Sequence, residues 1–242
     1  MEPLLSVEDL HVRYGAFEAV RGVSFALRAG EILGIVGESG SGKSTVAKVL
    51  VGLEKASAGR ISVAASKPTF QMVFQDAVGS LNPRMTVRQT LEEAIAHGRH
   101  RDVSPRALLA RVGLSEAVLR QYPREMSGGQ CQRVSIARAL AVRPDVLVAD
   151  EPVSALDVSV QARVLNLLRD LRRETGLTIL LIAHDLAVVK NVCDRICVME
   201  RGRFVDAGDS AEVFAHPTSD YTKRLLAAVP TLDGMTSPPL QA

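Results

Sequence analysis

The stretch Gly37-Glu-Ser-Gly-Ser-Gly-Lys-Ser-Thr45 fits the spacing G-x-x-x-x-G-K-[ST] and decides which fold the chain can adopt. Glycines at these positions let the backbone curl tightly, so that successive N–H groups point at a di- or triphosphate. The apolar run at 31–36 is typical of a buried strand, and 46–51 continues as a helix whose positive end faces the phosphates. This context favours a phosphate-binding loop over an ordinary Gly/Ser-rich turn. We therefore predict a site for a nucleoside triphosphate.

Within this loop, Lys43 carries a positive charge for the outer phosphates, and the Ser44 hydroxyl is a ligand for Mg²⁺. The residues of the loop predicted to contact the nucleotide are Gly37, Glu38, Ser39, Gly40, Ser41, Gly42, Lys43, Ser44 and Thr45.

Composition limits the classes of protein that remain. A chain of 242 residues with 47% hydrophobic residues fits one large α/β domain, or one domain with an inserted subdomain. The 29 basic and 27 acidic residues leave a net charge of +2, and aromatic residues make up only 4%, so we expect no nucleic-acid partner.

Three cysteines without a paired framework indicate reduced, buried thiols. Residues 1–10 do not resemble a secretory signal, and no apolar run reaches the roughly 20 residues that span a bilayer, so we expect contact with a membrane only through a partner.

The order of periodic segments predicts an α/β fold with three parts. Two strands at 4–12 and 19–27 precede the loop and predict a small N-terminal antiparallel sheet. Helical patterns without strands fill 86–121, which indicates an inserted helical subdomain at about 77–142. Strands and helices then alternate up to Val198, the signature of a parallel core sheet. We expect one domain over 1–230 and a disordered tail at 231–242. The further strands are predicted at 60–63, 69–75, 146–150, 178–183 and 195–199, and the long helix at 158–173.

Polar residues follow several of these apolar runs directly. Because ligands bind beyond the carboxyl ends of parallel strands, the fold should gather these residues around the phosphate-binding loop. The residues are Gln75, Asp150 with Glu151, and His184. A turn at the end of a strand is the structural alternative for the acidic pair.

Each of these residues has a chemistry that suits phosphoryl transfer. Asp150 should hold the Mg²⁺ shell together with Ser44, and Gln75 can reach the metal or the attacking water. Glu151 is the candidate general base, and His184 can donate a hydrogen bond to the γ-phosphate. Lys43 completes the set of predicted catalytic residues.

The element Ser127-Gly-Gly-Gln130 opens a helix and allows two interpretations. Ser127 and Gln130 match a capping box, which is a purely structural role. Two glycines at the start of a helix also expose N–H groups that suit an anion. The residues alone leave both interpretations open.

Taken in order, these motifs resemble those of the ATP-binding cassette (ABC) ATPases, from about Val7 to Pro230. The resemblance implies Mg²⁺-dependent ATP hydrolysis, with Tyr14 stacking on the adenine and Asp157 in the loop that ends Ser154-Ala-Leu-Asp157. It also implies that Ser127, Gly128, Gly129 and Gln130 close the nucleotide site of a second, identical or paralogous cassette. Met126 stands where this family more often has Leu.

The stretch from Phe74 to Val87 and the segments His216-Pro217 and Tyr221-Thr222 resemble the oligopeptide, dipeptide and nickel uptake ATPases. This narrower resemblance implies a peripheral subunit on the cytoplasmic face of the inner membrane. It would energise import through permease subunits and, indirectly, an extracytoplasmic solute-binding protein. The segment between Gly59 and Gln75 is shorter than in that family, so we expect a reduced edge strand or turn there. The chain has no Cys-rich extension after Pro230, which favours a compact subunit without an iron–sulfur site and a nickel or metal-chelate solute. The alternatives are a non-transport ABC ATPase that acts on nucleic acid and the cassette of an exporter.

Overall fold

The protein begins with a three-stranded antiparallel sheet in the order β2-β1-β4. The computed structural model describes residues 3–64, 67–98 and 102–228, so the predicted tail at 231–242 lies outside the described residues. The strands are β1 (Pro3–Tyr14), β2 (Phe17–Arg28) and β4 (Ala58–Val63). Along β1 the apolar residues alternate and face inward, while β4 is exposed along its whole length. The predicted antiparallel unit is confirmed, with β4 added at its edge.

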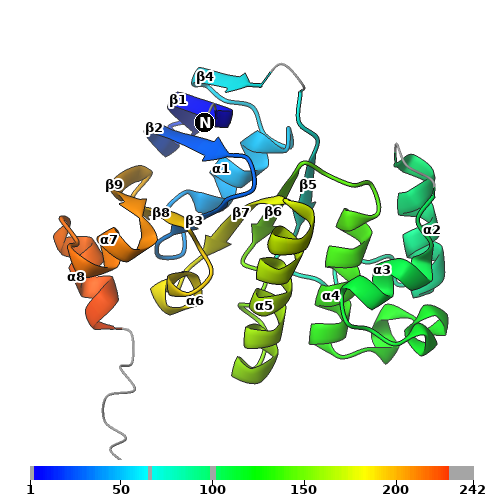
Figure 1. The fold of residues 1–242 in the computed structure, drawn as a ribbon. Helices are drawn as coiled ribbons and strands as arrows, with labels where there is room; N and C mark the ends of the chain where they lie inside the picture. Colours follow the sequence, from blue (N-terminus) through cyan, green and yellow to red (C-terminus); the bar gives the residue numbers. More distant parts are fainter. Residues whose placement is uncertain (1–2, 65–66, 99–101, 229–242) are drawn as a thin grey trace, which may run out of the picture.

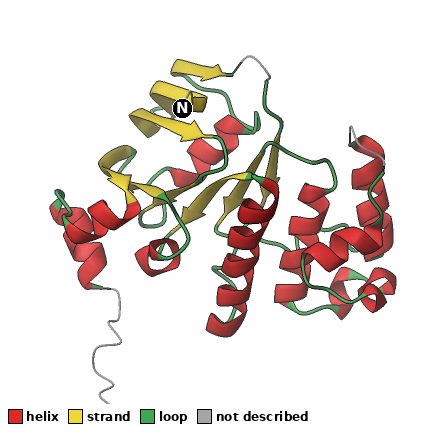
Figure 2. Cartoon of the chain, viewed as in Figure 1, coloured by secondary structure: helices red, strands yellow, loops and turns green. Residues whose placement is uncertain are grey.

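A six-stranded sheet forms the centre of the molecule, in the order β5-β6-β7-β3-β8-β9 (Figures 1 and 2). Its first five strands run parallel, and β9 pairs antiparallel with β8, so the sheet is mixed. β3, β6 and β7 are buried along their whole length, as expected for strands covered on both faces. The strands are β3 (Ile32–Val36), β5 (Phe70–Val73), β6 (Val146–Asp150), β7 (Thr178–Ala183), β8 (Arg195–Glu200) and β9 (Arg203–Asp209).

Two hydrophobic cores lie on the two faces of this sheet. On one face, α1 (Lys43–Leu50) and the antiparallel sheet share a core with alternate strand residues such as Leu33 and Ile35. On the other face, α4 (Gly128–Leu140), α5 (Val158–Thr175) and α6 (Leu186–Lys190) pack with the remaining strand residues. The three cysteines are free and buried, as predicted.

A helical region lies between β5 and β6 at one side of the molecule (Figure 1). It contains α2 (Val87–His97), α3 (Pro105–Arg111), two 3₁₀ turns at Glu116–Arg120 and Pro123–Glu125, and α4. A complete capping box at Thr86 and Gln89 starts α2. The subdomain boundary at about 77–142 stays a prediction. At the opposite side, α7 (Ser210–Ala215) and α8 (Asp220–Ala227) follow β9.

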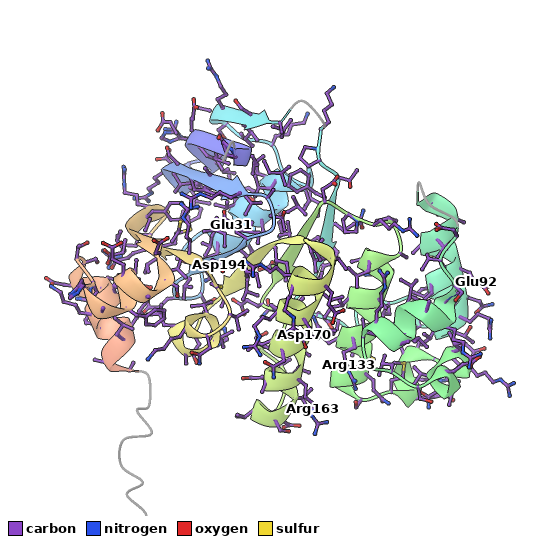
Figure 3. The ribbon with its side chains drawn as sticks, viewed as in Figure 1. Glu31, Glu92, Arg133, Arg163, Asp170 and Asp194 are labelled. Atoms are coloured by element: carbon purple, nitrogen blue, oxygen red, sulfur yellow. The ribbon has the colours of Figure 1, made fainter. Side chains whose placement is uncertain are left out.

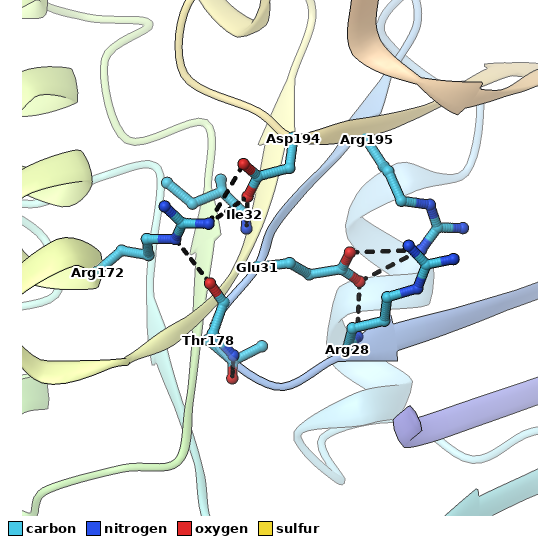
Figure 4. Close-up of polar contacts among 8 residues, drawn as sticks. Arg28, Glu31, Ile32, Arg172, Thr178, Asp194 and Arg195 are labelled. Atoms are coloured by element: carbon cyan, nitrogen blue, oxygen red, sulfur yellow. Dashed lines mark hydrogen bonds and ion pairs between the residues drawn. The ribbon is translucent and has the colours of Figure 1, made fainter. Parts of the chain in front are cut away.

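Charged side chains cover the outside of both regions, and Arg133 of α4 and Arg163 of α5 lie on neighbouring helices (Figure 3). Two ion pairs close the end of the core sheet where β3 begins. Arg172 contacts Asp194 at 3.2 Å, and Asp194 also accepts a hydrogen bond from the Ile32 N–H (Figure 4). Glu31, 6% exposed, contacts Arg195 at 3.3 Å. These pairs fix the start of the strand that leads to the phosphate-binding loop.

Candidate functional site

The loop at 37–42 connects the end of β3 to the start of α1, as its sequence predicts. Two of its glycines are required by space. A Cβ at Gly37 would lie 2.1 Å from the Met199 carbonyl oxygen, and one at Gly42 would lie 2.5 Å from the Ala19 carbonyl oxygen. Gly42 also has φ of 109°, which strongly disfavours other residues. The turn therefore brings backbone N–H groups to the N-terminal end of α1, where they suit an anion.

Lys43 is buried at the base of this loop, with 3% of its surface exposed. Its Nζ donates a hydrogen bond to the Glu38 carbonyl oxygen at 2.7 Å. Burial lowers the pKa of Lys43, while the nearby Glu151, Asp150 and Glu38 favour the charged form. Among the described residues, no salt bridge involves Lys43. The ammonium group is therefore placed to gain from an incoming anion.

Ser44 and Asp150 meet beside the loop although they are far apart in the sequence. The Ser44 hydroxyl donates a hydrogen bond to Asp150 Oδ1 at 2.9 Å. Burial raises the pKa of Asp150, and the hydrogen bond from Ser44 opposes that shift. Two converging oxygen donors, one of them a buried carboxylate, fit a hard divalent cation such as Mg²⁺.

Glu151 lies at the centre of the polar cluster. Gln75 Nε2 donates a hydrogen bond to Glu151 Oε2 at 3.1 Å, and His184 Nδ1 lies 3.4 Å from the same oxygen. Glu151 has φ of 44°, in the left-handed region that non-glycine residues rarely adopt. Backbone strain of this kind is common where a functional side chain must be aimed. The three residues follow β5, β6 and β7, so the predicted gathering at the carboxyl ends of the strands is confirmed.

Gln75 differs in one respect from its prediction. The strand expected at 69–75 pairs with β6 only over Phe70–Val73, so Gln75 lies in an exposed loop rather than at the last position of the strand. A second contact, to the Ser154 hydroxyl at 3.4 Å, holds the Gln75 amide near β6. Its amide faces the Glu151 side chain rather than Ser44 and Asp150.

A cavity of about 660 Å³ joins these residues to the tip of the β1–β2 hairpin. Tyr14 lines it as predicted, and its ring is 44% exposed. Phe17, 59% exposed, pairs across the hairpin with Tyr14 and lines the same cavity. Sequence reasoning did not assign Phe17, Ala19 or Ser154 to the cavity, although Ser154 begins the loop already identified by its resemblance. The aromatic pair spaced around Gly15 was a usable signal for Phe17. The lining residues predicted from the sequence are Tyr14, Glu38, Ser39, Gly40, Gly42, Lys43, Ser44, Thr45, Gln75, Glu151 and His184.

Several predicted residues lie outside this cavity. Gly37 and Ser41 form the back of the loop, and Ser41 lines a separate small cavity behind it. Asp157 is exposed at the start of α5. The residues that start α4, Ser127, Gly128, Gly129 and Gln130, also do not line the nucleotide cavity of their own chain.

The capping interpretation of Ser127 and Gln130 is confirmed. The Ser127 hydroxyl accepts a hydrogen bond from the Gln130 N–H at 3.3 Å, and Gln130 Oε1 accepts one from the Ser127 N–H at 2.9 Å. Gly129 has a packing role as well, because a Cβ there would lie 2.4 Å from Val160 Cγ1 of α5. A contact between these residues and an anion stays a prediction.

Comparison with known proteins agrees with this geometry. The sequence profile described as ABC transporter matches residues 20–154. The oligopeptide transport ATP-binding protein OppF of Salmonella typhimurium is 44% identical over 262 residues, covering 95% of this chain and 78% of that protein. The chain belongs to the ABC transporter family. OppF of Escherichia coli is 46% identical, again with 95% of this chain and 78% of that protein covered.

Solved structures support the same assignment. CbiO1 of Clostridium perfringens, part of an ABC transporter complex, has a TM-score of 0.79 at 30% identity, covering 89% of this chain and 92% of that one. The cassette MJ0796, solved as a dimer bound to ADP and Pi, has a TM-score of 0.73 at 27% identity, covering 85% and 98%. The ABC ATPase fold and the ATP-hydrolysing activity expected from the sequence are confirmed, and the relatives support an importer subunit over the two alternatives. No helix among the described residues has the length and apolar character needed to cross a membrane.

Proposed function

We propose that this protein hydrolyses ATP to power the uptake of oligopeptides through an ABC transporter. The observation that carries the proposal is the position of Glu151 between Gln75 and His184, at 3.1 and 3.4 Å, beside the Ser44–Asp150 pair. Relatives that are 44–46% identical and named for oligopeptide transport support the solute class. Peptides are therefore preferred to the nickel or metal-chelate solute that was expected from the sequence.

We assign ATP and Mg²⁺ to the cavity described above. Tyr14 is suited to stack on the adenine, and the loop N–H groups with Lys43 are suited to hold the phosphates. Ser44 and Asp150 would hold the cation, and Gln75 would contribute its amide oxygen only after turning from Glu151 toward that pair. A bound Mg²⁺ supplies Lewis-acid stabilisation of the charge that develops on the phosphates.

The chemistry then depends on how the protein holds water. Of the two adjacent carboxylates, Asp150 and Glu151, it is Glu151 that both Gln75 and His184 contact. Glu151 is therefore the proposed base that orients the attacking water and takes its proton. His184 is exposed at the rim, where it can donate a hydrogen bond to the γ-phosphate. The Lys43 ammonium group would neutralise charge on the phosphates.

A second cassette is part of the proposal. Ser127 and Gly128 are exposed at the start of α4, and within the described part of the chain the Ser127 hydroxyl accepts a hydrogen bond and donates none. An exposed anion-binding element that does not line its own cavity can act on the site of another cassette. Asp157, exposed at the start of α5, is assigned to the same interface. The partner cassette is either a second copy or a paralogue.

A groove of about 890 Å³ between β5, α2 and α4 is the proposed docking site for the permease. Large apolar side chains stand exposed beside it, including Leu53 at 58% and Phe74 at 38%. A groove of this size, lined by apolar side chains together with charged ones such as Glu93 and Arg138, suits a short amphipathic helix. Docking there would place the protein on the cytoplasmic face of the membrane, and a solute-binding protein would act only through the permease.

ATP turnover by the purified protein tests the site. Glu151→Gln should keep ATP affinity within about twofold and slow hydrolysis by about 100-fold or more, because the base is lost while the shape is kept. Lys43→Ala should instead lose ATP affinity. Normal turnover in Glu151→Gln, or unchanged ATP binding in Lys43→Ala, contradicts the assigned roles.

The solute is tested separately in proteoliposomes that contain the permease subunits of an oligopeptide transporter from the same organism. ATP hydrolysis should rise when an oligopeptide and its binding protein are added together. Nickel added in place of the peptide should not raise it. Stimulation by nickel alone would overturn the peptide assignment and leave the ATPase assignment standing.

A further inference from the structure

The C-terminal helix α8 contacts the phosphate-binding loop directly, although neither motif analysis nor the proposed function assigns it a role there. The Tyr221 side chain is 5% exposed and packs in the core. Its hydroxyl accepts a hydrogen bond from the Glu38 N–H at 2.9 Å, across 183 residues of sequence. A buried tyrosine hydroxyl normally has a partner, and here the partner is the backbone of the nucleotide site.

The backbone of Glu38 is held on both sides of its Cα. Its N–H donates to Tyr221, and its carbonyl oxygen accepts hydrogen bonds from Lys43 Nζ at 2.7 Å and from the Ser41 N–H at 3.2 Å. The N–H and the carbonyl group lie in two adjacent planar peptides that meet at the Glu38 Cα, so a hydrogen bond to the first restricts the Cα from which the second extends. The Tyr221 hydroxyl therefore helps to fix the acceptor that positions the Lys43 ammonium group.

The helix that carries Tyr221 is itself anchored. The buried carboxylate of Asp206, in β9, accepts hydrogen bonds from the Thr218 N–H at 3.1 Å and the Ser219 N–H at 3.0 Å, and also from the Thr218 hydroxyl. Ser219 caps α8 through its hydroxyl, which accepts from the Tyr221 N–H at 3.1 Å. Tyr221 thus lies in the first turn of a helix whose start is fixed to the core sheet.

Charged groups tie the same turn of α8 to the end of β8. Arg224 lies 3.9 Å from Glu200, and its guanidinium lies 5.9 Å from the centre of the Tyr221 ring. Both groups line the cavity of about 220 Å³ behind the loop, together with Glu38 and Ser41. The Tyr221 ring is therefore bordered by the Arg224 guanidinium as well as by the core, which limits how far its hydroxyl can move.

From this geometry we propose that Tyr221 is a positioning residue for ATP binding. It holds the backbone at Glu38, and through the neighbouring carbonyl group Lys43, in the arrangement that receives the phosphates. A pre-arranged loop avoids the cost of ordering it when the ligand binds. The inference rests on the proposed ATP site at Lys43, and its test is arranged so that the two can fail separately.

The test is Tyr221→Phe in the full chain, which keeps the ring and removes only the hydroxyl. The KM for ATP is expected to rise about three- to tenfold, because one neutral hydrogen bond contributes at most about a factor of ten in an equilibrium constant. The kcat should stay within about twofold, since Glu151 and His184 are untouched. ATP affinity measured in a Glu151→Gln background should fall by the same factor as the KM rises.

Lys223→Ala is the matched control. Lys223 lies in the same helix, and among the salt bridges of the described residues it pairs only with the exposed Asp220, at 3.0 Å. The Lys223→Ala variant should therefore keep the KM for ATP of the unmodified protein. An unchanged KM in Tyr221→Phe contradicts the inference. So does a joint loss of kcat, KM and melting temperature, which indicates a merely structural role. If Lys43→Ala also leaves ATP binding intact, the proposed ATP site itself is wrong.

Discussion

Replacing Gly129 by Ala tests why a glycine stands at the start of α4. In a helix, a Gly-to-Ala change normally stabilises a protein by about 0.5–1 kcal/mol. At Gly129 the new Cβ would lie 2.4 Å from Val160 Cγ1, closer than two carbon atoms can approach. Overpacking of this kind costs about 1–3 kcal/mol. We therefore expect Gly129→Ala to destabilise the protein instead of stabilising it, with a net loss of about 1–2 kcal/mol in the free energy of unfolding.

Gly128 offers a control in the same helical turn. A Cβ at Gly128 would lie 3.5 Å from Leu156 Cδ2, which is an ordinary contact. Gly128→Ala should thus be neutral or slightly stabilising. Thermal unfolding measures both, and because 1 kcal/mol corresponds to about 2–4 °C in a protein of this size, Gly129→Ala should melt about 2–8 °C lower. The reasoning is refuted if Gly129→Ala melts as high as Gly128→Ala.

The double variant Gly129→Ala/Val160→Ala separates packing from phosphate binding. Truncating Val160 removes the atom that clashes, so the two changes should couple favourably by about 1–2 kcal/mol, in the range found for residues in contact. If the double variant regains both the stability and any ATP turnover that Gly129→Ala loses, Gly129 is needed only for packing against α5. If stability returns and turnover does not, the small residue is also needed where a second cassette's phosphate approaches.

Two further predictions concern groups away from the nucleotide cavity. The hydrogen bond to Glu18 is the main cause that raises the pKa of His11 above its ordinary 6.5. Because the folded state favours the protonated imidazole, the stabilisation from this contact is complete below pH 6.5 and is lost as the pH rises through the raised pKa. The melting-temperature advantage over His11→Gln should accordingly shrink between about pH 6 and pH 9, and a constant difference would exclude the linkage. Arg172→Met removes the contact to Asp194 at 3.2 Å (Figure 4) and the hydrogen bond to the Gly30 carbonyl oxygen at 2.6 Å. It should lower the melting temperature by about 2–4 °C with the KM for ATP unchanged. A changed KM in Arg172→Met would mean that the start of β3 affects the phosphate-binding loop at its other end.

Much of the site could be predicted because its signals are local. The spacing of Gly37, Gly42 and Lys43 is a property of one short segment, and the periodicity of the flanking strand and helix supports it. Asp150, Glu151 and His184 were found because each directly follows an apolar run, and parallel strands bring their carboxyl ends to one edge. Gln75 was placed correctly although its strand ends earlier than expected.

Other features depend on distances that no local pattern records. Phe17 and Ser154 reach the cavity because the hairpin tip and the loop after β6 meet there. The closeness of Gly129 to Val160 depends on how α4 crosses α5, and a sequence motif cannot distinguish that packing from a ligand contact.

The sequence by itself determined the chemistry of this protein, namely a triphosphate loop, a carboxylate pair and the strands that carry them, because residue type and spacing set those properties. The tertiary structure alone decided which side chains support that chemistry. Tyr221 and Glu38 are separated by 183 residues, and only the docking of α8 behind the loop brings the hydroxyl within 2.9 Å of the Glu38 nitrogen. Hydrogen bonds act over about 3 Å, so their partners are settled by the packing of whole elements and not by the order of residues along the chain.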